Sequence, residues 1–585
     1  MDYKFGPRVE DNGVTFRLWA PSAKGADLDL DGPRHPLHKR EDGFWEAFVE
    51  GVKPGARYRF NVEGRNVPDI ASRQQERDSN GWSIVRGSFG IPPMDGPLSP
   101  WHEAIICEVH VGTVTPEGTF NALKERLEYF RDAGFTTLEI MPIADFPGRR
   151  NWGYDGTLIF APDTSYGTPE DFRALVDRAH ELGICIVLDV VYNHFGTVHN
   201  FLPDYCPEWF DETVKTPWGP GIDFSRPEVK QFYFENAVWW LTEFDLDGLR
   251  FDAVHEIKSE GSDTFLGDLA KVCRANKPGC KLIIENMDNH AYWLERDESD
   301  EPVKFSAQWN DSYHHVMTYL ITGEPKGGYE DPNKDAIADL EKALADGFIH
   351  DGDDDADNGG KNRGGPASQL PMEAFVQFVQ NHDWIGNRAD YSRLAERIDP
   401  RRAHFARFVT MLQPALPIGF MGDEAWITSK FPFFYDLPEP FASEKATDRY
   451  DQMRNIFNEE VEEGALPDPQ DPATFEMAKL DWNQLEQPEH REALDNFRHI
   501  AALRREQIWP LSATKCLNSW SARQGNGIIC SWQYEAGCHN MALNPTDHEI
   551  EMSFQSADPS AVVGEFRRDG DHVWLGPWSA VIWRS

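Results

Sequence analysis

Eight short apolar segments alternate with helical patterns along most of this chain, and this rhythm constrains the fold more than any other feature. The apolar segments begin at Ala104, Thr136, Ile184, Asp247, Lys281, Phe305, Phe375 and Leu416. Two of the intervening helical stretches, residues 119–134 and 168–183, end at a glycine, and Thr168 is suited to cap the second. Because alternating strands and helices favour a parallel sheet covered by helices, eight such pairs predict an α/β fold with a (β/α)8 TIM barrel.

The two ends of the chain have a different pattern. Residues 1–95 contain short alternating strands separated by Gly, Pro and Asp turns, which predicts an N-terminal β-sandwich. Short strands return in residues 506–585 and predict a C-terminal β-domain. The barrel then occupies residues 101–505, with long insertions at 192–235 and 323–371. Long connections on a barrel often carry function, so we expect both insertions to border the functional site.

An acidic run in the second insertion raises the question of calcium binding. Asp353, Asp355 and Asp357 alternate as ligands of an EF-hand loop do, but Gly364 stands where that loop needs its bidentate glutamate. The run also lacks apolar residues, which favours a solvated, mobile loop. We therefore predict no metal-ligating residues and no cofactor, and whether a structural metal is bound stays open.

The net charge of −41, from 57 basic and 98 acidic residues, limits the possible partners. An acidic chain repels phosphate backbones, which argues against nucleic acid as a partner. A neutral ligand is unaffected by this charge.

The sequence also predicts where the protein works. Its first residues contain no apolar signal segment, and no run is long enough to cross a membrane. The eight cysteines are scattered without a CxxC pair, which is typical of a reducing compartment. We expect a cytoplasmic protein without a membrane partner; its oligomeric state stays open.

Three carboxylates follow apolar segments at positions where barrel strands should end. They are Asp252, Glu285 and Asp383. Active sites of such barrels open at the carboxyl ends of the strands, and glycosidic-bond cleavage needs paired carboxylates. Arg250 lies two residues before Asp252, so both side chains share one face of the strand, where the guanidinium would keep a nucleophile ionised. The apolar run before Glu285 favours its protonated form, which suits a general acid.

Other polar and aromatic residues stand beside these segments. His194 and His382 are expected to be neutral hydrogen-bonding partners of sugar hydroxyls. Trp152 and Tyr154 lie in NWGYD after the second strand, and Tyr154 could stack on a sugar ring. Taken alone, each of these residues could equally be structural.

Four segments together resemble the signature regions of the α-amylase family of glycoside hydrolases, GH13. They are DVVYNH (189–194), GLRFDAVHE (248–256), LIIEN (282–286) and FVQNHD (378–383). The resemblance implies that Asp252 is the nucleophile, Glu285 the acid/base and Asp383 the transition-state stabiliser. It also implies a sugar-binding role for Tyr154, Trp152, Asp189, His194, Arg250, His255 and His382.

A narrower resemblance covers nearly the whole chain. Segments such as CEVHVGTVTPEGTF (from Cys107) and EIMPIADFPGRRNWGYDG (from Glu139) are similar to those of the maltooligosyltrehalose trehalohydrolases. That family has a β-sandwich, a barrel and a C-terminal β-domain. It hydrolyses the α-1,4 bond next to the terminal trehalose unit of a maltooligosaccharide, so the expected partner is an α-glucan.

Three segments depart from that narrower pattern: the acidic loop after Asp351, residues 286–288 and the GTVHN stretch after Phe195. Two alternatives therefore stay open. One is another GH13 enzyme, which would be a branching or debranching enzyme or an α-amylase-like hydrolase. The other is an inactive glucan-binding protein on the same scaffold.

Overall fold

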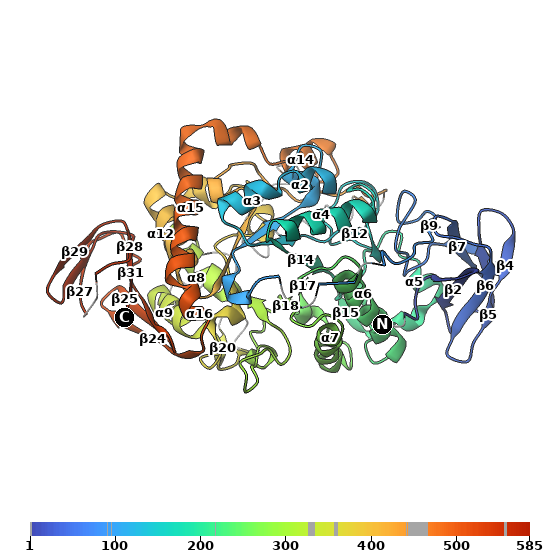
Figure 1. Ribbon diagram of the computed structural model, residues 1–585, viewed down its shortest axis with the longest axis horizontal. Coiled ribbons are helices and arrows are strands. Elements are labelled where there is room, and N and C mark those ends of the chain that lie inside the picture. The colour runs from blue at the N-terminus through green and yellow to red at the C-terminus, as the bar shows by residue number, and fades with distance from the viewer. Residues whose placement is uncertain are drawn as a thin grey trace.

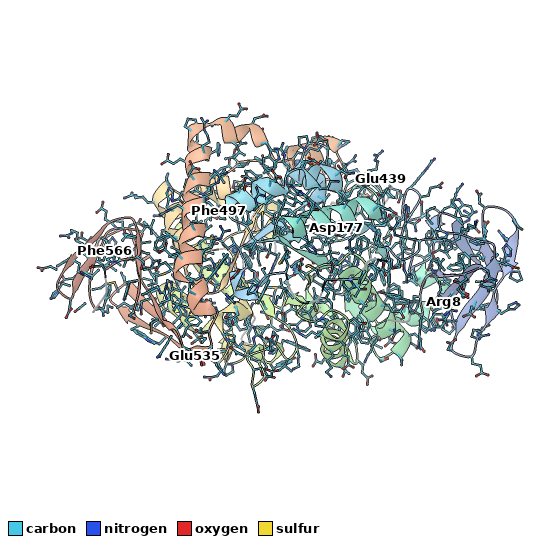
Figure 2. All side chains as sticks on the ribbon, in the orientation of Figure 1. Arg8, Asp177, Glu439, Phe497, Glu535 and Phe566 are labelled. Atoms are coloured by element: carbon cyan, nitrogen blue, oxygen red, sulfur yellow. The ribbon has the colours of Figure 1, made fainter. Side chains whose placement is uncertain are left out.

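The structure is a computed structural model. It describes residues 3–90, 92–94, 96, 98–216, 218–325, 334–355, 361–439, 441–442, 466–554 and 558–585, and the side chains of all of these except 353–355 and 361–362. The molecule is elongated, with β-sheets at both ends and a helix-covered barrel between them (Figure 1). Arg8 and Phe566 lie towards opposite ends of the long axis (Figure 2).

The predicted TIM barrel is confirmed. Eight strands close in the order β10-β11-β14-β17-β18-β19-β22-β23, and every neighbouring pair is parallel. The strands are β10 (Ile106–Val109), β11 (Thr137–Ile140), β14 (Cys185–Val190), β17 (Gly248–Phe251), β18 (Lys281–Ile284), β19 (Ala307–Trp309), β22 (Phe375–Gln377) and β23 (Leu416–Phe420). Each of the eight apolar segments supplies one strand.

Helices cover the outside of the barrel. The principal ones are α4 (Pro169–Glu181), α6 (Pro227–Glu243), α7 (Ser262–Asn276), α8 (Asp311–Thr322), α12 (Pro400–Leu412) and α15 (Pro488–Gln507). Thr168 caps α4 as expected, because its side chain accepts a hydrogen bond from the backbone N–H of Asp171. The single helix expected over residues 119–134 is two, α2 (Phe120–Lys124) and α3 (Leu127–Ala133). At this break the backbone N–H groups of Arg126 and Tyr129 donate to the carbonyls three residues earlier, those of Leu123 and Arg126. This is the 3₁₀ pattern, in which the hydrogen bond spans three residues and not the four of an α-helix.

The barrel interior has an apolar layer below a charged one. Ile106, Val187, Ile283, Val376 and Ile418 belong to one buried apolar cluster inside the barrel. Side chains of a strand alternate between its two faces, so Glu108 and Asp189, two positions after Ile106 and Val187, also point inward. Together with Glu139 and Arg250 they are four buried ionisable residues on neighbouring strands. The barrel therefore ends in a desolvated layer of ionisable groups.

Two sheets form each end of the molecule. The N-terminal sheets have the orders β1-β2-β6-β5 and β4-β3-β7-β8, and β9 pairs with β7. Their strands are β1 (Arg8–Glu10), β2 (Gly13–Trp19), β3 (Ala26–Asp29), β4 (Arg34–Pro36), β5 (His38–Lys39), β6 (Phe44–Glu50), β7 (Arg57–Val62), β8 (Arg65–Val67) and β9 (Ser83–Ile84). The C-terminal sheets have the orders β24-β25-β26-β31-β28 and β27-β30-β29. Their strands are β24 (Cys516–Gln524), β25 (Gly527–Tyr534), β26 (Gly537–Asn544), β27 (Ile550–Ser553), β28 (Ala561–Val563), β29 (Phe566–Asp569), β30 (His572–Leu575) and β31 (Ser579–Arg584).

The insertions carry short elements of their own. The first contains the hairpin of β15 (Phe210–Thr216) and β16 (Gly219–Ile222). The second contains α9 (Ala336–Asp346) and the pair β20 (Asp351–Asp355) and β21 (Lys361–Gly364). The acidic side chains considered for calcium, from Asp353 to Asp357, lie outside the described residues.

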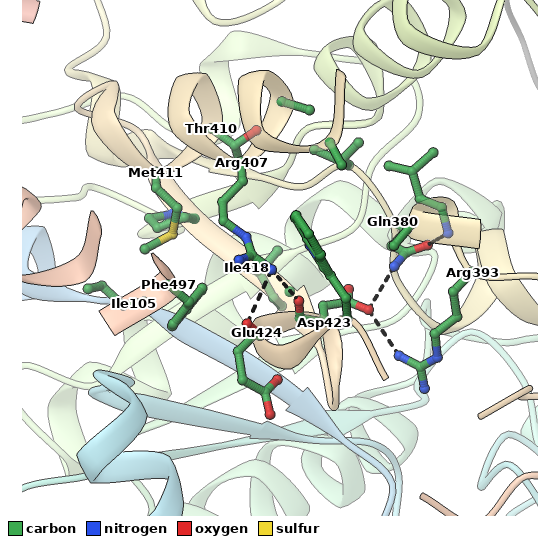
Figure 3. A pocket seen from close by; sticks show the side chains of 18 of the residues that line it. Ile105, Gln380, Arg393, Arg407, Thr410, Met411, Ile418, Asp423, Glu424 and Phe497 are labelled. Carbon is green, nitrogen blue, oxygen red and sulfur yellow. Dashed lines mark hydrogen bonds and ion pairs between the residues drawn. The ribbon is translucent and has the colours of Figure 1, made fainter. Parts of the chain in front are cut away.

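An apolar cavity of about 110 Å³ lies outside the barrel wall. Ile105 lines it beside β10, Pro417 from β23, Ala406 from α12 and Phe497 from α15. Figure 3 shows polar groups at its edge, where Arg407 donates to the backbone carbonyls of residues 423 and 424.

Among the described helices, none is long and apolar enough to cross a membrane.

Candidate active site

Arg250 is the centre of the charged layer. Its guanidinium is fully buried and donates hydrogen bonds to Asp189 at 2.7 Å, to Asp252 at 3.0 Å and to Glu285 at 2.5 Å. The guanidinium carbon also lies 4.0 Å from the centre of the Trp309 ring. One rigid cation therefore joins carboxylates from three neighbouring strands, which is the use to which the planar fork of arginine is suited.

Asp252 is held by two further contacts. Asn193 donates through its side-chain nitrogen to the Asp252 carboxylate at 2.8 Å and to the Asp252 backbone carbonyl at 2.9 Å. Arg250 occupies the other carboxylate oxygen. The next residue, Ala253, has φ 37° and ψ 54°, a left-handed conformation that is unfavourable for alanine. Such strain is typical of sites where the fold fixes a functional group.

Glu285 is oriented by the same turn. The backbone N–H of Ala253 donates to Glu285 Oε2 at 3.0 Å, and Arg250 contacts the same oxygen. The Glu285 side chain is 17% exposed and that of Asp252 is 14% exposed, so both are accessible at the carboxyl end of the barrel. Two accessible carboxylates that share one buried cation can serve as nucleophile and acid/base for a glycosidic bond.

Asp383 is the most open of the three acids, with a side chain that is 41% exposed. Gln380, three residues before Asp383, anchors this segment. Its side-chain amide donates to Asp423 at 2.7 Å and accepts from the backbone N–H of Leu394 at 2.8 Å. Asn387 donates to Asp383 at 3.2 Å. The carboxylate therefore projects from an anchored turn.

His382 differs from the expectation of a neutral imidazole. Burial lowers its pKa, but Asp383 and Glu108 raise it to about 9, so it is charged at pH 7. Its Nε2 lies 3.4 Å from Asp383 and its Nδ1 lies 2.5 Å from Glu108. The sequence expectation was wrong because the residue at Nδ1 comes from a strand 274 positions away.

Tyr154 and Asp189 form a second pair in the site. The Tyr154 hydroxyl donates to Asp189 at 2.7 Å, and the tyrosine ring stacks on His382 at 5.3 Å between centroids. Burial raises the pKa of Asp189 to about 7, although Arg250 opposes this. The partly exposed Tyr154 ring and the buried Asp189 border the acids around Arg250.

Trp152 lies behind the site. Its side chain is 3% exposed, its indole N–H donates to the carbonyl of Pro432, and its ring stacks on Phe431. Its ring edge meets His382 at 5.3 Å between centroids. Trp152 is therefore almost entirely buried and lies beside His382, and its predicted sugar-binding role stays a prediction.

The remaining predicted residues also lie around the acids. His194 donates from Nε2 to the Tyr154 carbonyl at 2.9 Å and stacks on Trp218 at 3.7 Å between centroids. His255 accepts a 3.4 Å hydrogen bond from the backbone N–H of Met287. Both histidines are therefore held at the carboxyl end of the barrel.

Comparisons with known proteins agree with this geometry. Residues 73–218 match the family described as alpha amylase, catalytic domain, and residues 4–79 match carbohydrate-binding module 48 (isoamylase N-terminal domain). The malto-oligosyltrehalose trehalohydrolase of Saccharolobus solfataricus is 32% identical and is matched over 95% of this chain and 97% of its own length. The enzyme of the same name from Rhizobium sp. strain M-11 is 31% identical, with 97% of both chains covered. This chain belongs to the malto-oligosyltrehalose trehalohydrolase family.

Solved structures have the same fold as this trehalohydrolase-family member. A protein from Salmonella typhimurium described as a candidate alpha amylase has a TM-score of 0.92 and is 34% identical, with all of both chains covered. A pullulanase from Bacillus acidopullulyticus has a TM-score of 0.72, covering all of this chain and 75% of its own, but at 16% identity it shows the fold alone.

Two residues near the acids of this trehalohydrolase-family chain were missed from the sequence. Glu108 contacts His382, and only its position as a charge inside the apolar run AIICEVHVG could have drawn attention to it. Asp311 begins α8 directly after β19, the strand between those that carry Glu285 and Asp383. Burial raises the pKa of Asp311 to about 7, and the charge of Glu285 adds to this.

A metal site was not expected. The described residues hold no group of three or more His, Cys, Asp or Glu side chains that could bind a metal ion. Asn193 uses its amide nitrogen on Asp252.

Proposed function

We propose that this protein is a retaining α-glucan hydrolase that cleaves the α-1,4 bond next to the terminal trehalose unit of maltooligosyl trehalose and releases trehalose. The observation that carries this proposal is the match over nearly the whole chain to relatives named malto-oligosyltrehalose trehalohydrolase. The arrangement of acids around Arg250 supports the chemistry.

In the first step we assign the nucleophile to Asp252 and the general acid to Glu285. An Asp252 oxygen attacks the anomeric carbon and forms a covalent glycosyl-enzyme, while Glu285 gives its proton to the leaving oxygen of the trehalose unit. Arg250 and Asn193 hold the Asp252 carboxylate, so little reorganisation is needed before attack.

In the second step Glu285 acts as a base. It takes a proton from water, the hydroxide attacks the anomeric carbon, and the bond to Asp252 breaks with its electrons returning to the carboxylate. We assign stabilisation of the oxocarbenium-like state to Asp383, whose open position lets it face the sugar.

We assign the remaining residues to the sugar subsite that contains the cleaved bond. Tyr154 would stack on the ring, and Asp189, His194, His255 and His382 would hold it directly or through their neighbours. We place Trp152 in support of His382.

A second candidate is a glucan branching enzyme. The branching enzyme GlgB 2 of Streptomyces coelicolor is 36% identical, but over only 54% of this chain and 48% of its own. Water and a sugar hydroxyl compete for the same glycosyl-enzyme, so the catalytic acids alone do not separate the two activities. The shorter match favours the hydrolase. A glucan-binding protein without activity is the least favoured reading, because all three acids are present.

Product analysis tests the proposed function. The protein is incubated with maltooligosyl trehalose and, separately, with maltooligosaccharides of the same length that end in an ordinary reducing glucose. We expect free trehalose as the main product and much slower cleavage of the second substrate. New α-1,6 branches would identify the branching enzyme, and equal cleavage of both substrates would rule out recognition of trehalose.

We also propose a reducing, cytoplasmic location and a division into residues 1–95, 101–505 and 506–585. All eight cysteines are free thiols, which supports the location. Recovery of the protein in the periplasmic or extracellular fraction of its native cells would contradict it. Limited proteolysis that cuts inside these ranges before cutting near their boundaries would contradict the division.

A further inference from the structure

Glu108 is a buried carboxylate below the active site that the reaction described above does not use. It lies on β10, is 2% exposed, and points towards His382. One oxygen accepts the backbone N–H of His382 at 2.9 Å, and the other lies 2.5 Å from His382 Nδ1. Both oxygens of one carboxylate are therefore committed to a single residue.

His382 has a carboxylate at each ring nitrogen. Glu108 lies at Nδ1, and Asp383 lies 3.4 Å from Nε2. A neutral imidazole has only one N–H, so it cannot donate to both acceptors at once. Donation on both sides requires the imidazolium, and a buried imidazolium needs a paired negative charge. Glu108 is the more deeply buried of the two acids, since the Asp383 side chain is 41% exposed.

The His382 ring cannot easily turn away from this arrangement. Tyr154 stacks on one face with 18° between the ring planes, and Trp152 meets the ring edge-on at 83°. Because these contacts fix the orientation of the ring, its hydrogen bonding depends on which ring nitrogens carry protons.

From these contacts we propose that Glu108 is a positioning residue that keeps His382 doubly protonated, with its Nε2–H directed at Asp383 and the bound sugar. The inference rests on the proposed function, because it assigns a task to His382 in the same reaction. The pair of Glu108 and His382 is neutral as a unit, so His382 can donate a hydrogen bond without adding net positive charge beside the developing oxocarbenium ion.

The other charges around His382 must be weighed. Arg250 from β17 disfavours its charged form, whereas Asp383 and Glu108 favour it. Burial lowers the pKa of His110, which follows β10, to about 4, and the charge of His382 adds to this. Glu139 from β11 also faces this group; burial raises its pKa well above the ordinary range, and the charges of Arg250 and His382 oppose this. Glu108 is the buried carboxylate in direct contact with the His382 ring.

The test compares Glu108→Gln with Glu235→Gln. Glutamine keeps the shape of both side chains, and Glu235 on α6 is a buried carboxylate that also accepts backbone N–H groups, those of Lys4 and Phe5, so it is a matched control. We expect Glu108→Gln to lower kcat by about 100-fold with little change in KM, and to move the alkaline limit of activity to lower pH. Glu235→Gln should retain the wild-type kcat and pH profile. Wild-type kcat and an unmoved profile in Glu108→Gln would overturn the proposal.

A second readout needs no substrate. Selective ¹⁵N labelling of histidine, with His382 assigned by its loss in His382→Gln, reports the protonation of both ring nitrogens. We expect both to carry protons at pH 8 in the wild type, and His382 to be neutral at that pH in Glu108→Gln. An unchanged His382 titration in a folded Glu108→Gln protein would overturn the proposal even if activity fell.

Glu108→Asp covers the case in which the glutamine variant does not fold. It keeps the charge but shortens the reach, so we expect His382 to stay protonated while kcat falls. Neutral His382 in this variant would contradict a role of the Glu108 charge. The kinetic measurements compare variants on any α-glucan that the enzyme cleaves, and the NMR measurement needs no substrate. Their outcome therefore does not depend on whether the released product is trehalose.

Discussion

Arg250 donates a 2.5 Å hydrogen bond to Glu285, and no part of the Arg250 side chain is exposed to solvent. The same guanidinium reaches Asp252 and Asp189, so four residues from three adjacent strands form one charged unit. A buried ion cluster is stable only while its charges balance. The site thus depends on arginine in particular, since a single point charge could not meet all three acids.

Replacement of Arg250 by lysine tests this dependence. Lysine keeps one positive charge but cannot hold Asp252 and Glu285 together, so we expect kcat to fall by about 100- to 1,000-fold. Arg250→Met should also lower the free energy of unfolding by about 3–5 kcal/mol, because it leaves buried acids without a cation. Enzyme kinetics and urea unfolding measure the two effects. Arg8→Lys, in an exposed ion pair with Glu10, is the control and should change neither.

The roles of the two accessible acids are separable. Asp252→Ala and Glu285→Gln should both leave a folded protein with almost no turnover, because each removes one half of a two-step displacement. In Glu285→Ala, added azide can occupy the vacated space and attack the glycosyl-enzyme, which should give a glycosyl azide with the α configuration. A β-glycosyl azide from that variant, or full turnover by either of the first two, would contradict the assignment.

The stability of the fold should depend on pH through His382. Burial lowers the pKa of His382, but Asp383 and Glu108 raise it from 6.5 to about 9. A pKa that is higher in the folded protein gives stability that is present below the unfolded value and is lost as pH rises through the folded value. We therefore expect the free energy of unfolding to fall by about 3 kcal/mol between pH 6.5 and 9 from this group. Urea unfolding at several pH values measures it, and an equal fall in His382→Gln would show that other groups are responsible.

Gly386 leaves room for Trp152, the residue whose ring packs against His382. A Cβ at Gly386 would lie 2.2 Å from two ring carbons of Trp152 and 2.9 Å from the carbonyl of Phe431. Gly386→Ala should therefore displace Trp152, lower the free energy of unfolding by about 1–3 kcal/mol and reduce kcat. Gly267→Ala, in the middle of α7 with nothing within 4 Å, should instead be neutral or stabilising. Differential scanning calorimetry and kinetics on both variants decide the matter.

The cavity outside the barrel offers a stabilising change. Gly419 lines it from β23, and a Cβ there would meet only Asp423, at 3.8 Å. Gly419→Ala should raise the free energy of unfolding by about 0.4–1 kcal/mol, because alanine restricts the unfolded chain without strain in the folded one. Gly248→Ala on β17 is the contrast, since its Cβ would lie 2.3 Å from the carbonyl of Lys281 and must destabilise. Stabilisation by both, or by neither, would contradict this packing argument.

The sequence predicted the barrel and the three acids because both have local signals. Apolar runs mark strands, and a carboxylate directly after such a run lies at the strand's end, as at Glu285. The contact between Glu108 and His382 has no such signal, because its two partners come from opposite ends of the barrel sequence. For the same reason the charge of His382 could not be foreseen.

Aromatic residues in loops were the least predictable. Trp152 and Tyr154 are two positions apart in one segment, yet Trp152 is buried against Phe431 while Tyr154 remains partly exposed. Which ring faces the site depends on the segment around Phe431, which is distant in sequence. The stacking of Trp218 on His194 likewise joins the first insertion to the barrel and follows from the fold alone.

The most direct test of the catalytic assignment is to trap the intermediate. Glu285→Gln is incubated with an α-glucosyl fluoride, whose leaving group needs no acid, and the protein is digested and analysed by mass spectrometry. The glycosyl-enzyme should accumulate because the variant lacks the base for the second step. We predict one glucosyl adduct, on Asp252; an adduct on another residue, or steady release of fluoride without any adduct, would contradict the account.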